Sequence, residues 1–138
     1  MNSTGTTLIH LECSKCNAEY SKDSIYNLSD CCSLPLFPKY DFDKVRECLK
    51  RRMLSDRNPN MWRYKEMMPV KYEENITTLG EGLTPLEPAD SLGKMLGFSN
   101  LFLKNESMNP TGSFKDRGMS AAISKAREFG LNKISIPT

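Results

Sequence analysis

Apolar residues recur along the chain at distinct spacings, and these spacings predict where helices and strands lie. The stretches 8–13 and 35–40 are typical of short extended segments, whereas 27–33 is polar and is predicted to be a loop. A helix is predicted over 41–54, with Asp41 as its N-cap. Its apolar positions recur every three or four residues and share one face: Phe42, Val45, Leu49 and Met53.

The second half of the chain contains one clear strand–loop–helix–strand unit. Residues 100–106 are predicted to be a strand, 107–113 a loop, 114–129 a helix ending before Gly130, and 133–138 a buried strand. The apolar positions of the helix lie on one face: Met119, Ala122, Ile123, Ala126 and Phe129. A βαβ crossover implies a parallel sheet covered by helices, so the predicted fold class is α/β.

Three regions follow from these patterns. Residues 1–40 form a cysteine-containing N-terminal region, 41–75 a helical lead-in segment, and 76–138 the start of an α/β domain. Within them, 61–70 is predicted to be a packing segment, and the glycine- and proline-rich stretch 80–97 holds a short helix near its end. Because ligands bind beyond the carboxyl ends of strands in open α/β sheets, a sequence that stops after its last strand is expected to be the leading part of a longer protein.

Composition and charge exclude several classes of function. Lys and Arg total 19 against 17 Asp and Glu in 138 residues, so the net charge of +2 gives no basis for a nucleic-acid partner. The sequence contains neither a bilayer-spanning apolar stretch nor a signal peptide, so a cytoplasmic location and no membrane partner are expected. An odd count of 5 cysteines favours reduced thiols over a disulfide framework.

The stretch NPTGSFKDRG (109–118) places Lys115 in the first turn of the predicted helix, after a turn shaped by Pro110 and Gly112. With Ser113 as a cap, the free amide groups and the positive end of the helix would disfavour a cation there and favour an anion. A neutral amine is a nucleophile that condenses with aldehydes and ketones.

A phosphorylated aldehyde would satisfy both features of this site, and pyridoxal phosphate is the common example. Phe114 would then offer an apolar face to the flat ring of the cofactor. Taken alone, the same residues also allow a simpler interpretation, in which Lys115 is a solvated first-turn lysine and Asp116 and Arg117 are surface charges.

The longer string NESMNPTGSFKDRG (105–118) resembles the cofactor-lysine motif of the fold-type-II pyridoxal-phosphate enzymes, the tryptophan synthase β-like group, and most of all its threonine synthase branch. WRYKEMMPV (62–70) and LGEGLTPL (79–86) are similar to segments that precede this motif in the same order. The resemblance implies that Lys115 holds the cofactor as a Schiff base, that Phe114 flanks the ring, and that Lys115 moves protons at the α and β carbons of the substrate. It assigns positioning to Asp116 and Arg117, and cleft shaping to Thr84 and Pro85.

By this resemblance the reaction converts O-phosphohomoserine and water into threonine and phosphate, with a small-molecule substrate and a homodimer as a compatible assembly. Alternatives are another enzyme of the same fold, such as cysteate synthase or threonine dehydratase, or a non-catalytic remnant or metal-binding module. The loops with which the family contacts the ring hydroxyl, the phosphate and the ring nitrogen are absent from 1–138. We therefore expect the isolated chain to lack turnover.

The cysteines suggest a second kind of site. Cys13 and Cys16 form a C-x-x-C pair that suits two thiolate ligands of zinc, and LECSKCNAEY (11–20) resembles half of a cysteine-rich ribbon found in some threonine synthases. Cys31 and Cys32 are adjacent and are not expected to place both sulfurs at tetrahedral positions, and His10 is an alternative fourth ligand. A degenerate ribbon without metal is therefore favoured over a complete zinc site. Cys48 is predicted to be a core thiol.

Overall fold

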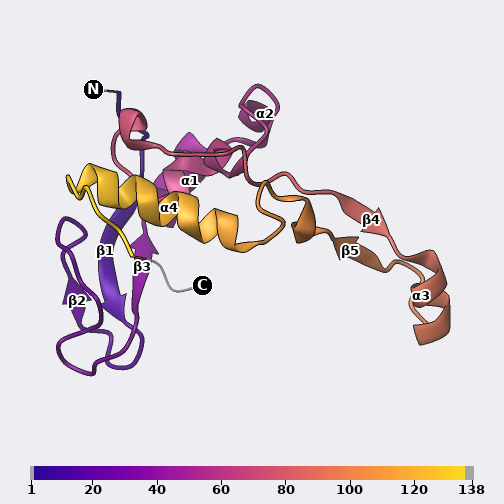
Figure 1. Cartoon of the computed structure of the whole chain (residues 1–138), viewed down its shortest axis with the longest axis horizontal. Coiled ribbons are helices and arrows are strands. Elements are labelled where there is room, and N and C mark those ends of the chain that lie inside the picture. The colour runs from indigo at the N-terminus through magenta and orange to yellow at the C-terminus, as the bar shows by residue number, and fades with distance from the viewer. Residues whose placement is uncertain (1, 136–138) are drawn as a thin grey trace.

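The computed structural model describes residues 2–135, which form a mixed α/β arrangement with two small antiparallel sheets (Figure 1). The first sheet has the order β2-β1-β3, with β1 (Leu8–Cys13) between β2 (Glu19–Tyr20) and β3 (Leu36–Tyr40). The second pairs β4 (Leu86–Pro88) with β5 (Phe102–Lys104). The predicted extended segments 8–13 and 35–40 and the strand within 100–106 are therefore confirmed.

The predicted parallel sheet is wrong for the part of the chain that the structure describes, because both sheets are antiparallel. Antiparallel strands need only a short connection, and the chain returns from β4 to β5 through the single helix α3 (Asp90–Leu96). The predicted strand 133–138 does not form in its first three residues, and 136–138 lie outside the described residues. Helix α4 (Lys115–Glu128) is therefore followed by no strand within the described residues up to 135.

The helix predicted over 41–54 is divided into α1 (Phe42–Cys48) and α2 (Arg51–Leu54). Asp41 is the N-cap as predicted, and its carboxylate accepts a hydrogen bond from the Lys44 amide at 3.0 Å. Leu49 then takes extended backbone angles that end α1. Since neither helix has a buried residue, no packed face stabilises a continuous helix through this point.

Most of the core residues come from the segment 61–76, which includes the 3-10 helices η1 (Met61–Met67) and η2 (Glu73–Asn75). Met61, Trp62 and Val70 are buried together, and Met68, Ile76 and Ala121 pack against them. The prediction that 61–70 is a packing segment is therefore confirmed. Because Ala121 belongs to α4, this core joins the helix of the lysine motif to the lead-in segment.

The buried side of α4 differs from the predicted apolar face. Its buried residues are Asp116, Ser120 and Ser124, whereas Ala122 is exposed. Ser120 accepts a hydrogen bond from the Trp62 indole at 2.9 Å, and Ser124 accepts one from the Thr77 amide at 2.8 Å. The prediction was wrong because the polar backbone of residue 77, rather than an apolar sheet, covers this side of the helix.

The β4–β5 pair and α3 extend from the rest of the molecule as an arm (Figure 1). Short 3-10 helix η3 (Glu106–Met108) then leads from β5 back toward α4. Several large apolar side chains of the arm are exposed, among them Leu86, Met95, Phe98 and Phe102. Among the described helices, none combines the length and apolar character needed to cross a membrane.

Candidate active site

Lys115 is the first residue of α4, directly after the turn predicted from the sequence. Gly112 has a φ of +77°, and its amide donates to the Asn109 carbonyl at 2.8 Å, which closes the turn. The Ser113 hydroxyl accepts a hydrogen bond from the Lys115 amide at 3.2 Å, but the N-cap position belongs to Phe114, which makes no side-chain cap bond. The loop thus delivers the lysine to the start of a helix whose position is fixed by the core.

The amide groups of the first turn are not free, contrary to the expectation from sequence. The Asp116 amide donates to the Ser113 carbonyl and the Arg117 amide to the Phe114 carbonyl, each at 3.3 Å. The carboxylate of Asp116, 7% exposed, supplies a negative charge at the positive end of the helix. It also accepts a hydrogen bond from the Thr111 amide at 2.8 Å and one from the Thr111 hydroxyl. Asp116 therefore holds the loop, and the amides of Lys115, Asp116 and Arg117 are already hydrogen-bonded.

A cavity of about 470 Å³ lies beside Lys115. One wall is the segment 77–81 and the other is the start of α4 with its preceding loop, the lining residues being Thr77, Thr78, Leu79, Glu81, Thr111, Ser113, Lys115, Asp116, Met119, Ser120 and Ile123. Among the described residues, the Lys115 amine has no hydrogen-bond or ion-pair partner. The apolar residues that were predicted to face a sheet, Met119 and Ile123, instead form part of this wall.

Glu81 is the buried carboxylate of the cavity wall, with 1% of its surface exposed. The Thr78 hydroxyl and the Leu79 amide each donate to it at 2.9 Å. Burial alone would raise the pKa of Glu81, but hydrogen bonds, foremost from Ser120 and the backbone, outweigh it and lower the pKa. The wall opposite Lys115 therefore carries a fixed negative charge.

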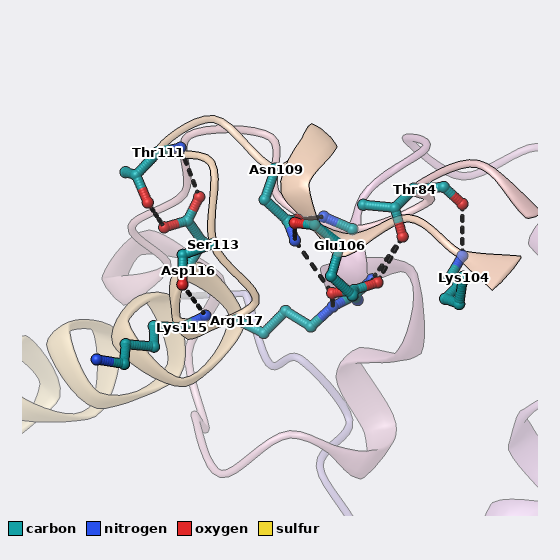
Figure 2. A network of polar contacts seen from close by, with 10 residues as sticks. Thr84, Lys104, Glu106, Asn109, Thr111, Ser113, Lys115, Asp116 and Arg117 are labelled. Atoms are coloured by element: carbon teal, nitrogen blue, oxygen red, sulfur yellow. Dashed lines mark hydrogen bonds and ion pairs between the residues drawn. The ribbon is translucent and has the colours of Figure 1, made fainter.

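Arg117 points away from the cavity and into a polar network, while Lys115 extends in the other direction along α4 (Figure 2). The Arg117 guanidinium donates to both carboxylate oxygens of Glu106, at 2.7 and 2.9 Å. Glu106 also accepts hydrogen bonds from the Thr84 hydroxyl at 2.5 Å and the Asn109 amide group at 3.0 Å. The network thus joins the LGEGLTPL segment to the lysine loop, because Asn109 in turn accepts from the Gly82 amide at 3.0 Å.

Hydrogen bonds from Arg117, and then from Thr84, lower the pKa of Glu106 to about 2. Sequence reasoning missed Glu106, Asn109 and Glu81 as parts of the site. Glu106 and Asn109 stand within the 105–118 string, and the pairing of a carboxylate with Arg117 across the loop was the signal that could have found them. Asp116 and Arg117 hold the loop and the network, which agrees with the positioning role that the resemblance gave them.

Phe114 is 66% exposed and does not line the cavity, so its contact with a cofactor ring remains a prediction. Thr84 takes part in the Glu106 network, and the Pro85 carbonyl accepts from the Asn105 amide at 3.0 Å. Neither Thr84 nor Pro85 lines the cavity itself. Thr84 and Pro85 therefore support the polar network around Glu106 and do not form a wall of the cavity.

The cysteines lie apart from this cavity, at the first sheet. Cys13 is buried, Cys16 and Cys31 are exposed, and Cys32 is half-buried. The structure brings all four of these sulfurs together, although adjacent Cys31 and Cys32 were not expected to reach one cluster. The group of four does not include His10. Cys48 is exposed at the end of α1, so its predicted place in the core is wrong, because α1 buries none of its residues.

Comparison with known proteins identifies relatives of both halves of the chain. Residues 77–137 match the family model described as pyridoxal-phosphate dependent enzyme. The threonine synthase of Methanosarcina acetivorans is 41% identical over 129 residues, which are 93% of this chain and 31% of that protein. The threonine synthase of Methanocaldococcus jannaschii is 41% identical over 88% of this chain and 30% of that protein. That of Halalkalibacterium halodurans is 52% identical over 71 residues. The chain thus spans less than a third of the length of these curated relatives.

Proposed function

We propose that residues 77–137, which match the family model described as pyridoxal-phosphate dependent enzyme, belong to that family and that Lys115 is the residue that binds the cofactor. We further propose that the chain acts as part of a threonine synthase, which converts O-phosphohomoserine and water into threonine and phosphate. The observation that carries the proposal is the unpaired Lys115 amine on the wall of a cavity of about 470 Å³. The names of the relatives that cover most of this chain support the choice of reaction.

The residues around Lys115 fit the aldehyde end of such a cofactor. The cavity has the size of ordinary small-molecule sites, and its amine is free to react because the described residues do not engage it. Met119 and Ile123 offer apolar surface for a flat ring, and the hydroxyls of Thr77, Thr78 and Ser113 offer hydrogen bonds. The amides of Lys115, Asp116 and Arg117 are already hydrogen-bonded, so these three amides do not bind the phosphate. The residues around Lys115 therefore fit the ring and the carbonyl group of the cofactor.

When bound, pyridoxal phosphate supplies an electron sink for the carbanions that form at the substrate. Lys115 has two tasks in this chain. Its amine would hold the cofactor at the carbonyl carbon, and the same amine, once released, would move protons at the α and β carbons of the substrate. Both tasks need a lysine whose backbone is fixed and whose amine can move, and α4 fixes the backbone.

The neighbouring residues hold this amine in place. Asp116 fixes the loop by accepting from Thr111, and Arg117 fixes the first turn by its two bonds to Glu106. Glu81 places a negative charge on the facing wall, which would attract the ammonium group of an amino-acid substrate. Met119 and Ile123 line the same wall of the cavity as Lys115, whose own side chain is exposed.

We also propose that this segment is part of a fold-type-II domain, that the substrate is a small molecule, and that the protein is cytoplasmic. The five free thiols support a reducing compartment.

The function is tested by adding pyridoxal phosphate to the full 138-residue chain and recording visible absorption after dialysis. A retained cofactor band is expected in the wild type and in Lys94→Ala, a matched control at an exposed lysine of α3, but not in Lys115→Ala. O-phosphohomoserine is then added to the loaded chain and the same band is recorded, because a substrate amine that takes the place of Lys115 shifts the band without a complete turnover. A band that persists in Lys115→Ala would contradict the role of Lys115. A band that O-phosphohomoserine leaves unchanged would contradict the substrate assigned to the chain.

A further inference from the structure

Four cysteine sulfurs converge at the end of the first sheet where β1 finishes at Cys13, and they are distant in sequence from Lys115. The sulfurs of Cys13, Cys16, Cys31 and Cys32 all lie within 4.8 Å of one another. A tetrahedral zinc ion with Zn–S bonds of about 2.3 Å holds its sulfurs about 3.8 Å apart. The Cys16 and Cys31 sulfurs are 3.1 Å apart and the others lie within the larger limit, so small side-chain rotations would produce that tetrahedron.

Two similar turns deliver these sulfurs. The Asn17 amide donates to the Cys13 carbonyl at 3.1 Å, and the Ser33 amide donates to the Ser29 carbonyl at 2.8 Å. Both turns end in a residue with positive φ, 60° at Asn17 and 52° at Ser33. The second turn therefore repeats the first, with Ser29 in the place of Cys13 and Cys32 in the place of Cys16.

This repetition explains how two adjacent cysteines serve one cluster. Cys32 takes the position that a second cysteine has in a C-x-x-C turn, while Ser29 cannot supply a thiolate. Cys31 provides the missing sulfur, and Tyr20 on β2 holds it there. The Tyr20 hydroxyl lies 3.3 Å from the Cys31 sulfur and accepts from the Cys31 amide at 3.2 Å. The buried Ser29 hydroxyl lies 3.3 Å from the Cys13 sulfur.

The surroundings of the cluster lack the apolar core that would otherwise stabilise the sheet. Among the described residues up to 40, the buried hydrophobic side chains are Leu8 and Cys13 alone. Larger apolar residues of the same region are exposed, namely Ile9, Ile25, Leu28, Leu34 and Phe37. Units this small need a metal, disulfides or a partner to supply the missing stability.

We propose that Cys13, Cys16, Cys31 and Cys32 bind one structural zinc ion that holds the N-terminal sheet together. All four ligands come from the protein, so the coordination sphere is closed and the ion has no open position for catalysis. Binding replaces the protons of the four thiols with one Zn²⁺ and releases those protons to solvent. The site is independent of pyridoxal phosphate and of the reaction proposed for Lys115.

The test uses the full chain, reduced and freed of metal, titrated with zinc and in parallel with cobalt. One equivalent of metal is expected, and cobalt should give the absorption of a tetrahedral thiolate site. Cys16→Ser and Cys31→Ser, both at exposed positions, should weaken metal affinity at least about tenfold. Cys48→Ser, an exposed cysteine outside the cluster, is the matched control and should leave affinity unchanged.

Two further readouts separate metal binding from general unfolding. The fluorescence of Trp62, which belongs to η1 and donates to Ser120 of α4, reports on the rest of the molecule and should persist in both variants. Amide hydrogen exchange in 8–40 should increase when metal is removed, while exchange in α4 stays constant. A reduced chain that binds no stoichiometric metal would overturn the proposal, as would an equal loss of affinity in Cys48→Ser. A Cys16–Cys31 disulfide in a chain that binds no zinc after reduction would show a redox pair instead.

Discussion

At the scale of single residues, three consecutive side chains of the lysine motif serve three different neighbours. Lys115 faces the cavity, Asp116 bonds Thr111 in the preceding loop, and Arg117 bonds Glu106 on the far side (Figure 2). Successive helical residues point in different directions, so a short string can reach all three. The position of Lys115 at a helix start was predictable from the sequence, because it rests on local turn chemistry. The hydrogen bonds of the first-turn amides were not predictable, because they depend on the conformation of Ser113 and Phe114.

Gly82 gives a residue-scale prediction. It has a φ of +104°, and an added Cβ would lie 2.6 Å from the Met61 backbone nitrogen. Gly82→Ala should lower the free energy of unfolding by about 1–3 kcal/mol, since alanine is strained at this φ and the facing backbone cannot move away cheaply. The matched control is Gly118→Ala in α4, where an added Cβ meets nothing within 4 Å and should stabilise the helix by about 0.5–1 kcal/mol. Urea denaturation measures both, and equal effects of the two substitutions would contradict this account.

At the scale of elements, α4 is held by polar contacts on a face that its sequence does not mark as buried. Ser120 and Ser124 bond the backbone of Thr77, and Glu128 accepts from the Lys71 amide at 2.6 Å. Periodicity predicted the helix within one residue at each end, because it reflects local propensity. It did not predict the buried face, because a serine is buried only where another segment supplies its hydrogen bonds.

The ion pair between η3 and α4 gives a pH prediction. The pKa of Glu106 is lowered in the folded state from an ordinary value of 4.5 to about 2. Its contribution to stability is therefore fully present above pH 4.5 and is lost as the pH falls toward 2. Glu106→Gln should be less stable than wild type at neutral pH, and the difference should shrink through this window.

Urea denaturation at several pH values measures that difference. Glu74→Gln, at an exposed glutamate of η2, is the control and should show no such narrowing. A Glu106→Gln deficit that stays constant from neutral pH down to pH 2 would contradict the role of the Arg117–Glu106 pair.

At the scale of the whole molecule, the local elements were predictable and their long-range pairing was not. The strand at 8–13, the Asp41 cap and the helix after the lysine loop each depend on nearby residues. The antiparallel partner of β5 and the division of 41–54 depend on which distant segments are available for pairing and packing. The same holds for Cys32, which joins Cys13 and Cys16 because two separate turns have the same backbone form, and for Cys31, which Tyr20 holds beside them.

The most direct test of the central claim is chemical trapping of the cofactor on the full chain. Pyridoxal phosphate is added at a stoichiometric amount, the adduct is reduced with borohydride, and the modified lysine is identified by peptide mass spectrometry. Lys115 should carry the label well above the exposed Lys94, and a cofactor analogue that lacks the aldehyde should give no adduct. Labelling spread evenly over exposed lysines, with Lys115 no more modified than Lys94, would contradict it.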